Sequence, residues 1–385
     1  MANTRVERSV RDLAPELARR AAEIEAARRM PLDLVAELKQ AGVFRMLVPR
    51  AYGGDEAPFP VSARVLEELA AADGAVGWTA MIGCETAQLF SLLPKSTFER
   101  IYRAGPDVIC GGAFAPEGTA DVSAAGLRAR GRWSFASGCQ HADWLFGNCV
   151  VLENGAARPG AAPGAPELRC VALPAAQWEI VENWRVLGMR GTGSHDIALA
   201  EQVVPHEQSF VLFGGVPNIS GPLFAAPLVQ FSLHIGCVAL GIARGALADL
   251  EALARGGKRR LYAPSSLGDS PLFQHALGRS TLDFEAARAL LHARVEEFWS
   301  EAQLGPVGPE RATHFIAAVA WVVNACAEVA SACYRAGGGS ALREASPLQR
   351  RLRDALTVTQ HASVQDTVFT RAGAARIGRD GSFGL

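Results

Sequence analysis

In residues 1–106, apolar positions recur mostly at the spacing of an α-helix. The first predicted helix carries its apolar face at Leu13, Leu17, Ala21 and Ile24. A second helix is expected to end at residues 41–43, before a turn that contains proline and two glycines. Helical spacing resumes at residues 61–83. The pattern therefore predicts an N-terminal helical domain over residues 1–106.

Residues 107–208 contain short alternating or wholly apolar runs, separated by glycine, proline and asparagine. Runs of this kind are typical of β-strands in a small antiparallel barrel or sheet. Residues 154–167, between two of the runs, have no apolar face to bury, so we predict a disordered or mobile surface loop there. The pattern predicts a central β-barrel domain over residues 107–208.

Long alanine- and leucine-rich segments with helical periodicity return in residues 209–385. Four such segments are typical of a helical bundle. The most apolar stretch, residues 315–327, is shorter than the roughly 20 residues that cross a bilayer, so we interpret it as a buried helix. A chain of 385 residues is too long for one core. The order of helix, sheet and helix predicts an α+β fold with three domains.

Composition and charge narrow the range of partners. The chain is 49% hydrophobic and 20% charged with a formal net charge of −1, which gives no electrostatic footprint for nucleic acid or an anionic membrane. The cysteines are scattered without a CxxC spacing and the histidines are not clustered, so no metal site or redox dithiol is indicated. The densely charged N-terminus lacks the apolar segment of a secretory signal. These features favour a cytoplasmic protein that binds small metabolites.

A polar stripe marks the last predicted helix, residues 346–361. Its members fall within one narrow arc at the helical period: Arg350, Asp354, Thr357 and His361. A neutral imidazole, with a pKa of about 6.5, can accept a proton from a weakly acidic hydroxyl or amine. His361 is therefore a candidate base whose ring Asp354 and Thr357 could orient. The alternative is a histidine satisfied by a core hydrogen bond.

Two motifs resemble signatures of the acyl-CoA dehydrogenase superfamily: AGVFRMLVPRAYGG at residues 41–54 and GGGS at residues 337–340. The resemblance covers nearly the whole chain and implies an N-terminal helical domain, a central β-barrel domain and a C-terminal four-helix bundle. In dehydrogenases of this superfamily a Tyr-Glu-Gly-Thr stretch supplies the base, whereas residues 360–363 here read QHAS. This replacement resembles the branch of two-component flavin-dependent monooxygenases.

The two positions where these dehydrogenases carry their glutamate correspond here to Ala362 and Phe231. Neither side chain can remove the proton next to a thioester carbonyl. The resemblance therefore implies a monooxygenase that uses dioxygen and reduced FMN or FAD from a separate flavin reductase. Its substrate would be a small organic molecule, with aromatic compounds and natural products as candidates. The apolar helix at residues 315–332 favours a homotetramer.

By the same resemblance, Phe135, Ser137 and Gly138 form a wall against the flavin, with Ser137 near the flavin N5 atom. The glycine would let the backbone approach a planar ring closely and leave the Ser137 hydroxyl free to form a hydrogen bond. The alternative is an ordinary junction between a strand and a turn.

A glycine-rich loop at residues 188–196 joins two predicted strands. Backbone amides and small polar side chains in such a loop can meet a flavin edge or a phosphate, so Thr192 and Ser194 are predicted cofactor contacts. No Gly-Lys-Ser/Thr sequence follows, which excludes a Walker-type phosphate loop. A tight loop without a ligand is the alternative. We predict that His195 lies at the surface.

The helix after residue 77 carries candidate substrate contacts, Trp78 and Glu85. Phenol hydroxylases of the resembled branch tend to have a histidine on this helix, so its absence here disfavours a phenolic substrate. Glu85 would bind an amine or a hydroxyl, or it is a solvated helix residue. Trp78 would line the pocket or fill the core between helices.

Four charged residues are predicted to contact the cofactor. Arg353 and Asp354 hold the flavin or, alternatively, lock the terminal helix through an ion pair. Lys258 and Arg260 stand where dehydrogenases place an arginine that binds the cofactor phosphate of a neighbouring subunit, although the usual Arg-x-x-Phe-Gly motif is missing.

The sequence thus predicts a flavin-dependent monooxygenase in which His361 and Ser137 are catalytic. Two alternatives stay open. One is an acyl-CoA dehydrogenase or oxidase that uses FAD and an unrecognised base. The other is a non-catalytic carrier of flavin or another ligand that keeps the fold.

Overall fold

The computed structural model describes residues 4–379 except residues 163, 260 and 262. The helices of the first hundred or so residues are α1 (Arg5–Ala27), α2 (Leu32–Ala41), α3 (Phe59–Ala72), α4 (Gly74–Cys84), α5 (Thr86–Phe90) and α6 (Lys95–Tyr102). α1 begins at a capping box, in which the side chains of Thr4 and Glu7 bind each other's backbone N–H groups. Its buried face includes Leu17, Ala21 and Ile24, as the spacing predicted.

One sheet follows, formed by β1 (Cys110–Ser123), β2 (Gly126–Ala136), β3 (Trp144–Glu153), β4 (Ala156–Ala157), β5 (Leu168–Pro174), β6 (Glu179–Val181), β7 (His195–Val204) and β8 (Ser209–Phe210). The described strands pair in the order β6-β7-β2-β1-β3-β5-β8, and β4 pairs with β3. β1 and β3 are parallel, whereas the sequence pattern predicted an antiparallel arrangement throughout. The pattern reports which residues are buried, and it does not report strand direction.

The sheet curves around Trp133, whose side chain is fully buried and whose indole N–H donates to the carbonyl oxygen of Asn148 at 2.6 Å. The neighbouring strands make room for the indole with glycine. A Cβ atom added to Gly118 or Gly147 would lie 2.0 or 2.6 Å from the Trp133 ring. The interior of the sheet is therefore a packed core.

Two predictions about the sheet were wrong in detail. The predicted boundary after residue 208 cuts off β8, which pairs with β5. The predicted mobile loop at residues 154–167 contains paired backbone in its described part. β4 pairs with the end of β3, and a bridge joins Pro159 to Pro166. Backbone hydrogen bonds form this hairpin without any apolar face, so hydrophobic patterning gave no sign of it.

The C-terminal helices are α7 (Pro227–Arg255), α8 (Pro271–Ala302), α9 (Pro309–Gly337), α10 (Pro347–Val358) and α11 (Thr367–Arg376). α7 to α10 are the four predicted bundle helices, and α11 is a short further helix that the sequence analysis missed. α7 and α9 are long and apolar enough to cross a membrane, but 83% and 56% of their most apolar windows are buried. Core helices of water-soluble proteins meet the same criterion.

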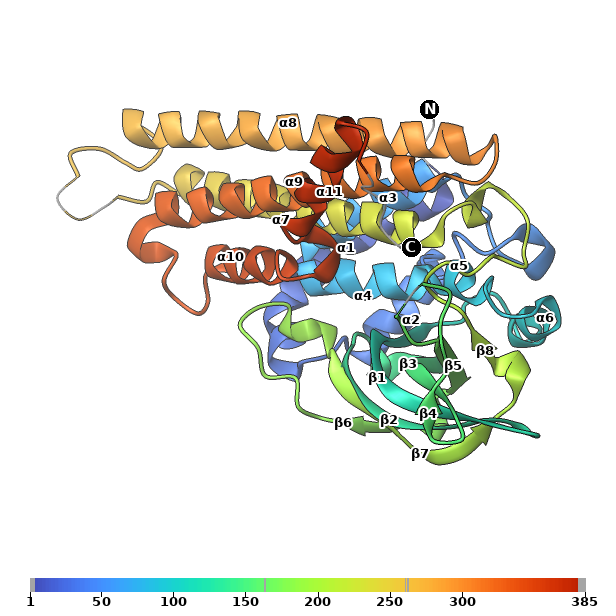
Figure 1. The fold of residues 1–385 in the computed structure, drawn as a ribbon. Helices are drawn as coiled ribbons and strands as arrows, with labels where there is room; N and C mark the ends of the chain where they lie inside the picture. Colours follow the sequence, from blue (N-terminus) through green and yellow to red (C-terminus); the bar gives the residue numbers. More distant parts are fainter. Residues whose placement is uncertain (1–3, 163, 260, 262, 380–385) are drawn as a thin grey trace.

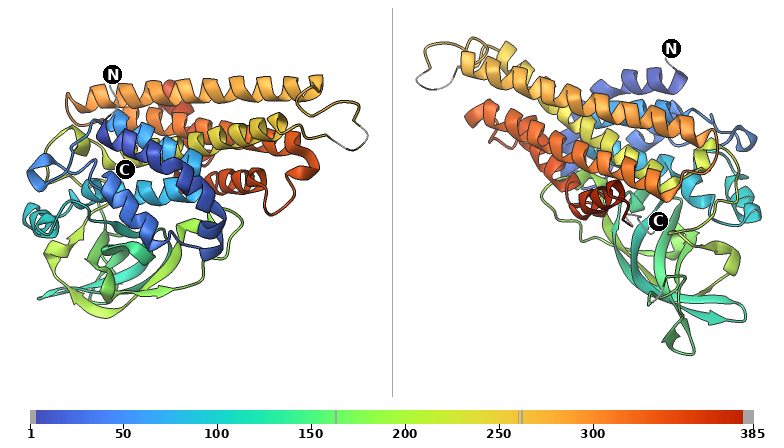
Figure 2. Two further views of the ribbon diagram at one scale, coloured as in Figure 1. Left: turned by 180° about the vertical axis from the view of Figure 1, so that it is seen from behind. Right: turned by 45° about the horizontal axis from the view of Figure 1, so that its top comes forward.

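Figure 1 shows the sheet beneath the bundle, with α4 lying between them. Both views in Figure 2 place the loop between α7 and α8 at one end of the bundle, far from the sheet. α4 packs against both α7 and β1. The order of helix, sheet and helix confirms the predicted fold class, and it brings α4, the central strands of the sheet and the start of α7 to one place.

Candidate active site

A cavity of about 420 Å³ lies between residues of the central strands β1, β2 and β3 and the first turns of α7. Further walls come from α4, α5 and the segment that follows α10. Seven of the predicted site residues line it: Trp78, Glu85, Phe135, Ser137, Thr192, Ser194 and His361. Residues from all three parts of the chain, predicted separately from the sequence, thus meet in one space.

A chain of hydrogen bonds with a fixed direction runs along one wall of this cavity. The Trp78 indole N–H donates to Ser137 Oγ at 3.1 Å, and the Thr192 hydroxyl donates to the carbonyl oxygen of Met189 at 2.8 Å. Ser194 Oγ lies between them, 2.7 Å from Ser137 Oγ and 2.6 Å from Thr192 Oγ1. An indole nitrogen only donates and a carbonyl only accepts. Ser137 therefore donates to Ser194, and Ser194 donates to Thr192.

This direction leaves Ser137 with one unused lone pair and no free proton. The predicted hydroxyl is not free to donate, because Trp78 and Ser194 already bind the Ser137 side chain. Ser137 can still accept one hydrogen bond from a group in the cavity. Trp78 lines the cavity, so the alternative that it only fills the core is also wrong.

The two neighbours of Ser137 in the predicted flavin wall differ in position. Phe135 has φ +66, which residues other than glycine rarely adopt, and its side chain is 70% exposed at the rim of the cavity. Gly138 does not line the cavity, contrary to its predicted cofactor contact. A Cβ atom added there would meet Thr79 and His141 at 3.1 Å. The glycine thus allows close packing within the protein.

His361 lies beyond the helix on which the sequence analysis placed it. α10 ends at Val358, and His361 has extended backbone, with φ −68 and ψ 140, at the start of a 3-10 turn. The ring is therefore not aligned with Asp354 and Thr357. Asp354 binds the backbone of Met189 instead, and Thr357 binds the backbone of Arg353. The prediction that these two residues orient the imidazole was wrong, because helical spacing assumed a helix that continues to residue 361.

The His361 imidazole is held by Ser363 and by two aromatic rings. Ser363 donates its backbone N–H to Nδ1 at 3.2 Å, and its Oγ lies 2.8 Å from the same atom. The rings of Trp78 and Phe231 lie 5.7 and 5.8 Å away, measured between centroids. Because Nδ1 accepts a hydrogen bond, the proton of the neutral ring is on Nε2.

Burial disfavours the charged imidazolium and lowers the pKa of His361 to about 4. At neutral pH the ring is therefore uncharged, and it has an Nε2–H to donate. This state differs from the predicted one, in which the imidazole accepts a proton. The arrangement favours a hydrogen-bond donor at this position over a base.

Glu85 is only 7% exposed and lines the cavity, so the alternative of a solvated helix residue is wrong. Its Oε1 is hydrogen-bonded to Nδ1 of His234, which has no exposed surface. On the far side of that ring, Nε2 lies 2.8 Å from Ser62 Oγ. Burial raises the pKa of the Glu85 carboxyl, and the adjacent imidazole opposes the shift.

The sequence analysis missed His234 and Ser62. The only available signal was a histidine in the middle of an apolar helical segment. Ser62 and Glu85 lie 172 and 149 residues away from it along the chain. Spacing rules apply over only a few residues, so no sequence pattern could pair these three side chains.

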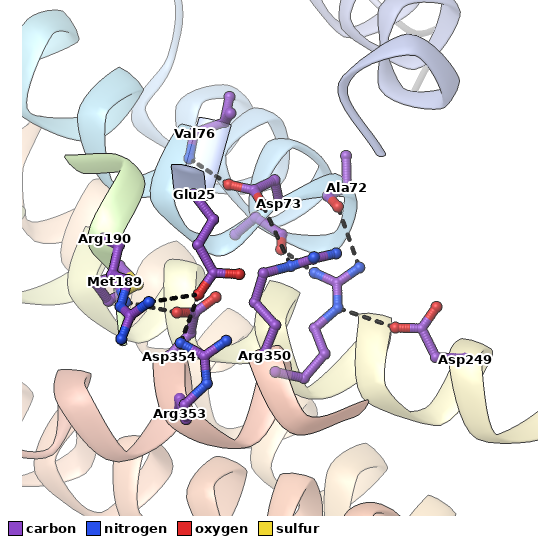
Figure 3. A network of polar contacts seen from close by, with 12 residues as sticks. Glu25, Ala72, Asp73, Val76, Met189, Arg190, Asp249, Arg350, Arg353 and Asp354 are labelled. Atoms are coloured by element: carbon purple, nitrogen blue, oxygen red, sulfur yellow. Dashed lines mark hydrogen bonds and ion pairs between the residues drawn. The ribbon is translucent and has the colours of Figure 1, made fainter. Parts of the chain in front are cut away.

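Arg353 and Asp354 bind the protein and do not line the cavity (Figure 3). The backbone N–H of Met189 donates to Asp354 Oδ1 at 2.6 Å. Arg353 donates to the carbonyl oxygen of Leu187 at 2.7 Å and pairs with Glu25 at 2.6 Å. Of the two predicted alternatives, the structure shows that these side chains hold the last helix to the rest of the protein. A contact of either residue with the flavin stays a prediction.

Arg351 also holds α10 to the rest of the protein. It donates to Asp249 at 3.1 Å and to the backbone carbonyl oxygens of residues 70–72. These carbonyls belong to the last turn of α3, where the helix dipole favours a positive charge. Burial, followed by the charge of nearby Asp73, raises the pKa of Asp354 to about 7.

Lys258 is exposed in the loop after α7, roughly 40 Å along the helix axis from Leu228 at the cavity. It cannot reach the cavity of its own chain. Arg260 lies outside the described residues. A contact between Lys258 and the cofactor of a neighbouring subunit stays a prediction.

His195 is buried, with 1% of its surface exposed, so its predicted surface position was wrong. Its Nδ1 accepts the backbone N–H of Trp184 at 3.0 Å. The ring, at the start of β7, thus accepts a hydrogen bond from the loop that precedes this strand.

Phe231 and Ala362, the two positions where the resemblance places a dehydrogenase glutamate, both line the cavity. Among the described lining residues, Glu85 is the one carboxylate, and none is lysine or arginine. The part of the chain that the structure describes holds no group of three or more His, Cys, Asp or Glu side chains suited to a metal ion. All of its cysteines are free and buried.

Comparison with known proteins agrees with this geometry. Two family models match the chain, the acyl-CoA dehydrogenase N-terminal domain over residues 3–93 and the acyl-CoA dehydrogenase C-terminal domain over residues 233–366. An indole-3-acetate monooxygenase from Pseudomonas putida is 33% identical over 362 residues, which cover 94% of this chain and 90% of that protein. The chain belongs to the acyl-CoA dehydrogenase superfamily.

The monooxygenase relatives place this superfamily member in the flavin-dependent monooxygenase branch, and a solved structure confirms its fold. The oxygenase component of an FADH2-dependent resorcinol hydroxylase from a Rhizobium species is 29% identical over 385 residues, covering 93% of this chain and 90% of that protein. XiaF from a Streptomyces species, solved with FADH2 and glycerol, superposes with a TM-score of 0.89 at 23% identity and covers 98% of this chain and 97% of that one. The predicted superfamily and branch are thereby confirmed.

Proposed function

We propose that this superfamily member is the oxygenase component of a two-component monooxygenase. It would receive reduced FMN or FAD from a separate flavin reductase and add one atom of dioxygen to a small aromatic molecule. The observation that carries the proposal is the cavity, which has aromatic walls and hydroxyl groups but no carboxylate at either dehydrogenase position. The oxygenase and monooxygenase names of its relatives support the same reaction class.

The polar groups of the cavity fit a flat heterocyclic ring such as that of a flavin. Reduced flavin, when bound, supplies the two electrons that let one oxygen atom enter the substrate while the other leaves as water. Ser137 keeps a lone pair for an N–H group, and the reduced flavin ring carries such a group at N5. The hydroxyls of Ser194 and Thr192 hold Ser137 in place, so its acceptor direction is fixed before any ligand arrives.

His361 would donate its Nε2–H to an oxygen atom of the reacting groups. The hydrogen bond from Ser363 to Nδ1 keeps the proton on Nε2, and the low pKa keeps the ring neutral. A neutral donor stabilises developing negative charge on oxygen without placing a permanent cation in an apolar space.

The walls of the cavity exclude water from the reaction. Phe114 packs against Phe146 and Phe231, with ring centroids 5.7 and 5.1 Å apart, and all three line the cavity. Aromatic faces offer no hydrogen bonds that would hold a water molecule in place. Dry surroundings would limit the wasteful release of hydrogen peroxide, and they strengthen every hydrogen bond inside.

A homotetramer in the cytoplasm is the assembly and location that we propose. A second cavity between α8 and α9 is lined by Leu272 and Trp321, whose side chains are 82% and 46% exposed. Apolar surfaces of this kind are typical of interfaces between copies of a chain. Lys258 would then meet the cofactor phosphate of a neighbouring subunit. Light scattering after size exclusion, on the wild type and Trp321→Glu, tests the assembly: we expect a tetramer that the variant disrupts.

A coupled assay tests the proposed reaction. The protein is mixed with a flavin reductase, NADH, FMN or FAD, and a panel of small aromatic molecules in air. We expect a product heavier than its substrate by one oxygen atom, and less hydrogen peroxide when that substrate is present. Hydrogen peroxide alone with every aromatic molecule, together with desaturation of an acyl-CoA, would contradict the proposal.

A further inference from the structure

The cavity has two polar ends that lie on the same helix face. Trp78 and Glu85 both line it, and a separation of seven residues puts them about 10 Å apart along the axis of α4 and its last turn. The Trp78 end carries the hydroxyl chain that starts at Ser137. At the other end, Glu85 is hydrogen-bonded to His234, which is hydrogen-bonded in turn to Ser62. Both of these residues are fully buried. The proposed reaction uses the first end and leaves the second without a role.

The positions of the protons at the Glu85 end follow from its hydrogen bonds. The Ser62 hydroxyl donates to the carbonyl oxygen of Phe59 at 2.7 Å, which uses its only proton. Ser62 must therefore accept from His234, whose Nε2 carries a hydrogen. A single further proton lies between His234 Nδ1 and Glu85 Oε1. The pair is either imidazolium with carboxylate or neutral imidazole with carboxylic acid, and it is uncharged overall in both states.

The second oxygen of the Glu85 carboxyl group is a hydrogen-bond acceptor in both states. In the ionised state it is a carboxylate oxygen, and in the neutral state it is the carbonyl oxygen of an acid whose proton points at His234. Either atom accepts a hydrogen bond and neither donates one. Hydrogen bonding to His234 thus fixes Glu85 as an acceptor, and the small exposed part of Glu85 faces the cavity.

The rest of the lining offers nothing to balance a negative ligand. The described lining residues contain no lysine or arginine, and the one histidine among them, His361, is kept neutral by burial. A buried anion without a partner is strongly unfavourable. An anionic group placed near the Glu85 carboxyl would meet repulsion as well.

We propose that Glu85, positioned by His234 and Ser62, selects the substrate of this cavity. The substrate is an aromatic molecule that presents an N–H or O–H donor to Glu85 and carries no anionic group. This inference rests on the proposed function for the identity of the site, and it adds the chemical class of the substrate. It also separates this chain from a relative named for the anion indole-3-acetate.

Calorimetric binding to the full-length protein, without flavin, tests this selection. The probes are two pairs that differ by one donor hydrogen, indole with 1-methylindole and 2-naphthol with 2-methoxynaphthalene, together with indole-3-acetate. We expect the donor-bearing member of at least one pair to bind about tenfold more tightly than its partner, because a buried acceptor left unpaired is costly. We expect indole-3-acetate to bind more weakly than indole.

Variants separate recognition from folding. Glu85→Leu should abolish the preference within the pair and leave the affinity for the donor-free member within about twofold. Glu85→Gln should keep most of the preference, since its amide N–H can donate to His234 Nδ1 while its carbonyl oxygen faces the cavity. His234→Phe should lower the preference without lowering affinity for the donor-free probe. Glu99→Leu, the same substitution at an exposed position on α6, is the matched control and should match the wild type.

Equal affinities within both pairs would overturn the proposal, as would a preference that survives in Glu85→Leu or tighter binding of indole-3-acetate than of indole. Because no flavin or oxygen is present, these results do not depend on turnover. A protein that fails to oxygenate any probe but shows the donor preference would contradict the proposed function alone.

Discussion

The last predicted helix, residues 346–361, contributes to two regions of the molecule that use their polar groups in opposite ways. In the anchor, formed by Arg351, Arg353 and Asp354, the charged side chains bind carboxylates, backbone carbonyls or a backbone N–H. In the cavity, Ser137 keeps one lone pair and His361 keeps an Nε2–H that binds no described residue. The boundary between the two regions is the end of α10 at Val358.

This difference gives a criterion for telling structure from function. A buried polar group whose hydrogen bonds are complete stabilises the fold and has nothing left for a ligand. A group that lines a cavity with a bond still available can bind one. Substitutions in the anchor should therefore change stability, and substitutions in the cavity should change binding or turnover.

The largest expected effect is at His361. His361→Phe keeps an aromatic ring but removes the donor, so product formation should fall by about 10²- to 10⁴-fold with an unchanged melting temperature. His361→Asn keeps an N–H donor and should recover part of the rate. Rates with saturating reduced flavin and calorimetric unfolding give the two measurements. Equal losses in both variants would mean that the donor is not the important property.

Arg351→Met should have the largest effect on stability. It removes the charge from a buried network with Asp249 and three carbonyl oxygens, so the free energy of unfolding should fall by roughly 3 kcal/mol or more. Turnover per folded molecule should stay the same. Urea unfolding measures the change, and Arg19→Met at an exposed position on α1 is the control. A stable but inactive variant would place this anchor in the active site.

Asp354→Asn should change how stability depends on pH. The folded pKa of Asp354, about 7, lies above the ordinary value of 3.8, so the folded protein holds this proton more tightly than the unfolded chain does. Its contribution is complete below about pH 4 and is lost as the pH rises to about 7. The variant lacks this titration, so we expect it to lose less stability than the wild type across that interval, by an amount on the order of 1–4 kcal/mol. Urea unfolding at several pH values measures it, and parallel curves would contradict the assigned pKa.

The smallest expected effect is at Ser137. Ser137→Ala removes one acceptor for the flavin, so the affinity for reduced flavin should fall by about two- to tenfold, as for a single hydrogen bond. Ser134→Ala lies in the same cavity but outside the hydroxyl chain, and it should leave the affinity unchanged. Anaerobic titration of reduced flavin provides the comparison. Equal affinities of Ser137→Ala and the wild type would remove Ser137 from the flavin site.

Much of the fold and part of the site could be predicted from the sequence. The order of helix, sheet and helix follows from the period of the apolar positions, and seven predicted residues meet in the cavity. The family resemblance, and not periodicity, indicated most of those residues. Periodicity alone would not have joined residues of α4 to residues that follow α10.

The failures have a common physical cause. Helical spacing extended the last helix past Val358, so it aligned His361 with Asp354 although the chain turns between them. It also gave no sign that the proton of His361 is on Nε2, which depends on the backbone N–H of Ser363. The pairing of Glu85 with His234 joins two helices that are distant in sequence. Contacts of this kind depend on tertiary packing, which local patterns do not report.

The most direct test of the central claim is the source of the oxygen atom in the product. The protein, reduced flavin and an oxygenated probe from the coupled assay are mixed with ¹⁸O₂ in a single turnover, and the product is analysed by mass spectrometry. The account predicts one ¹⁸O atom per product molecule. An unlabelled product, or a double bond formed in an acyl-CoA in the absence of dioxygen, would contradict it.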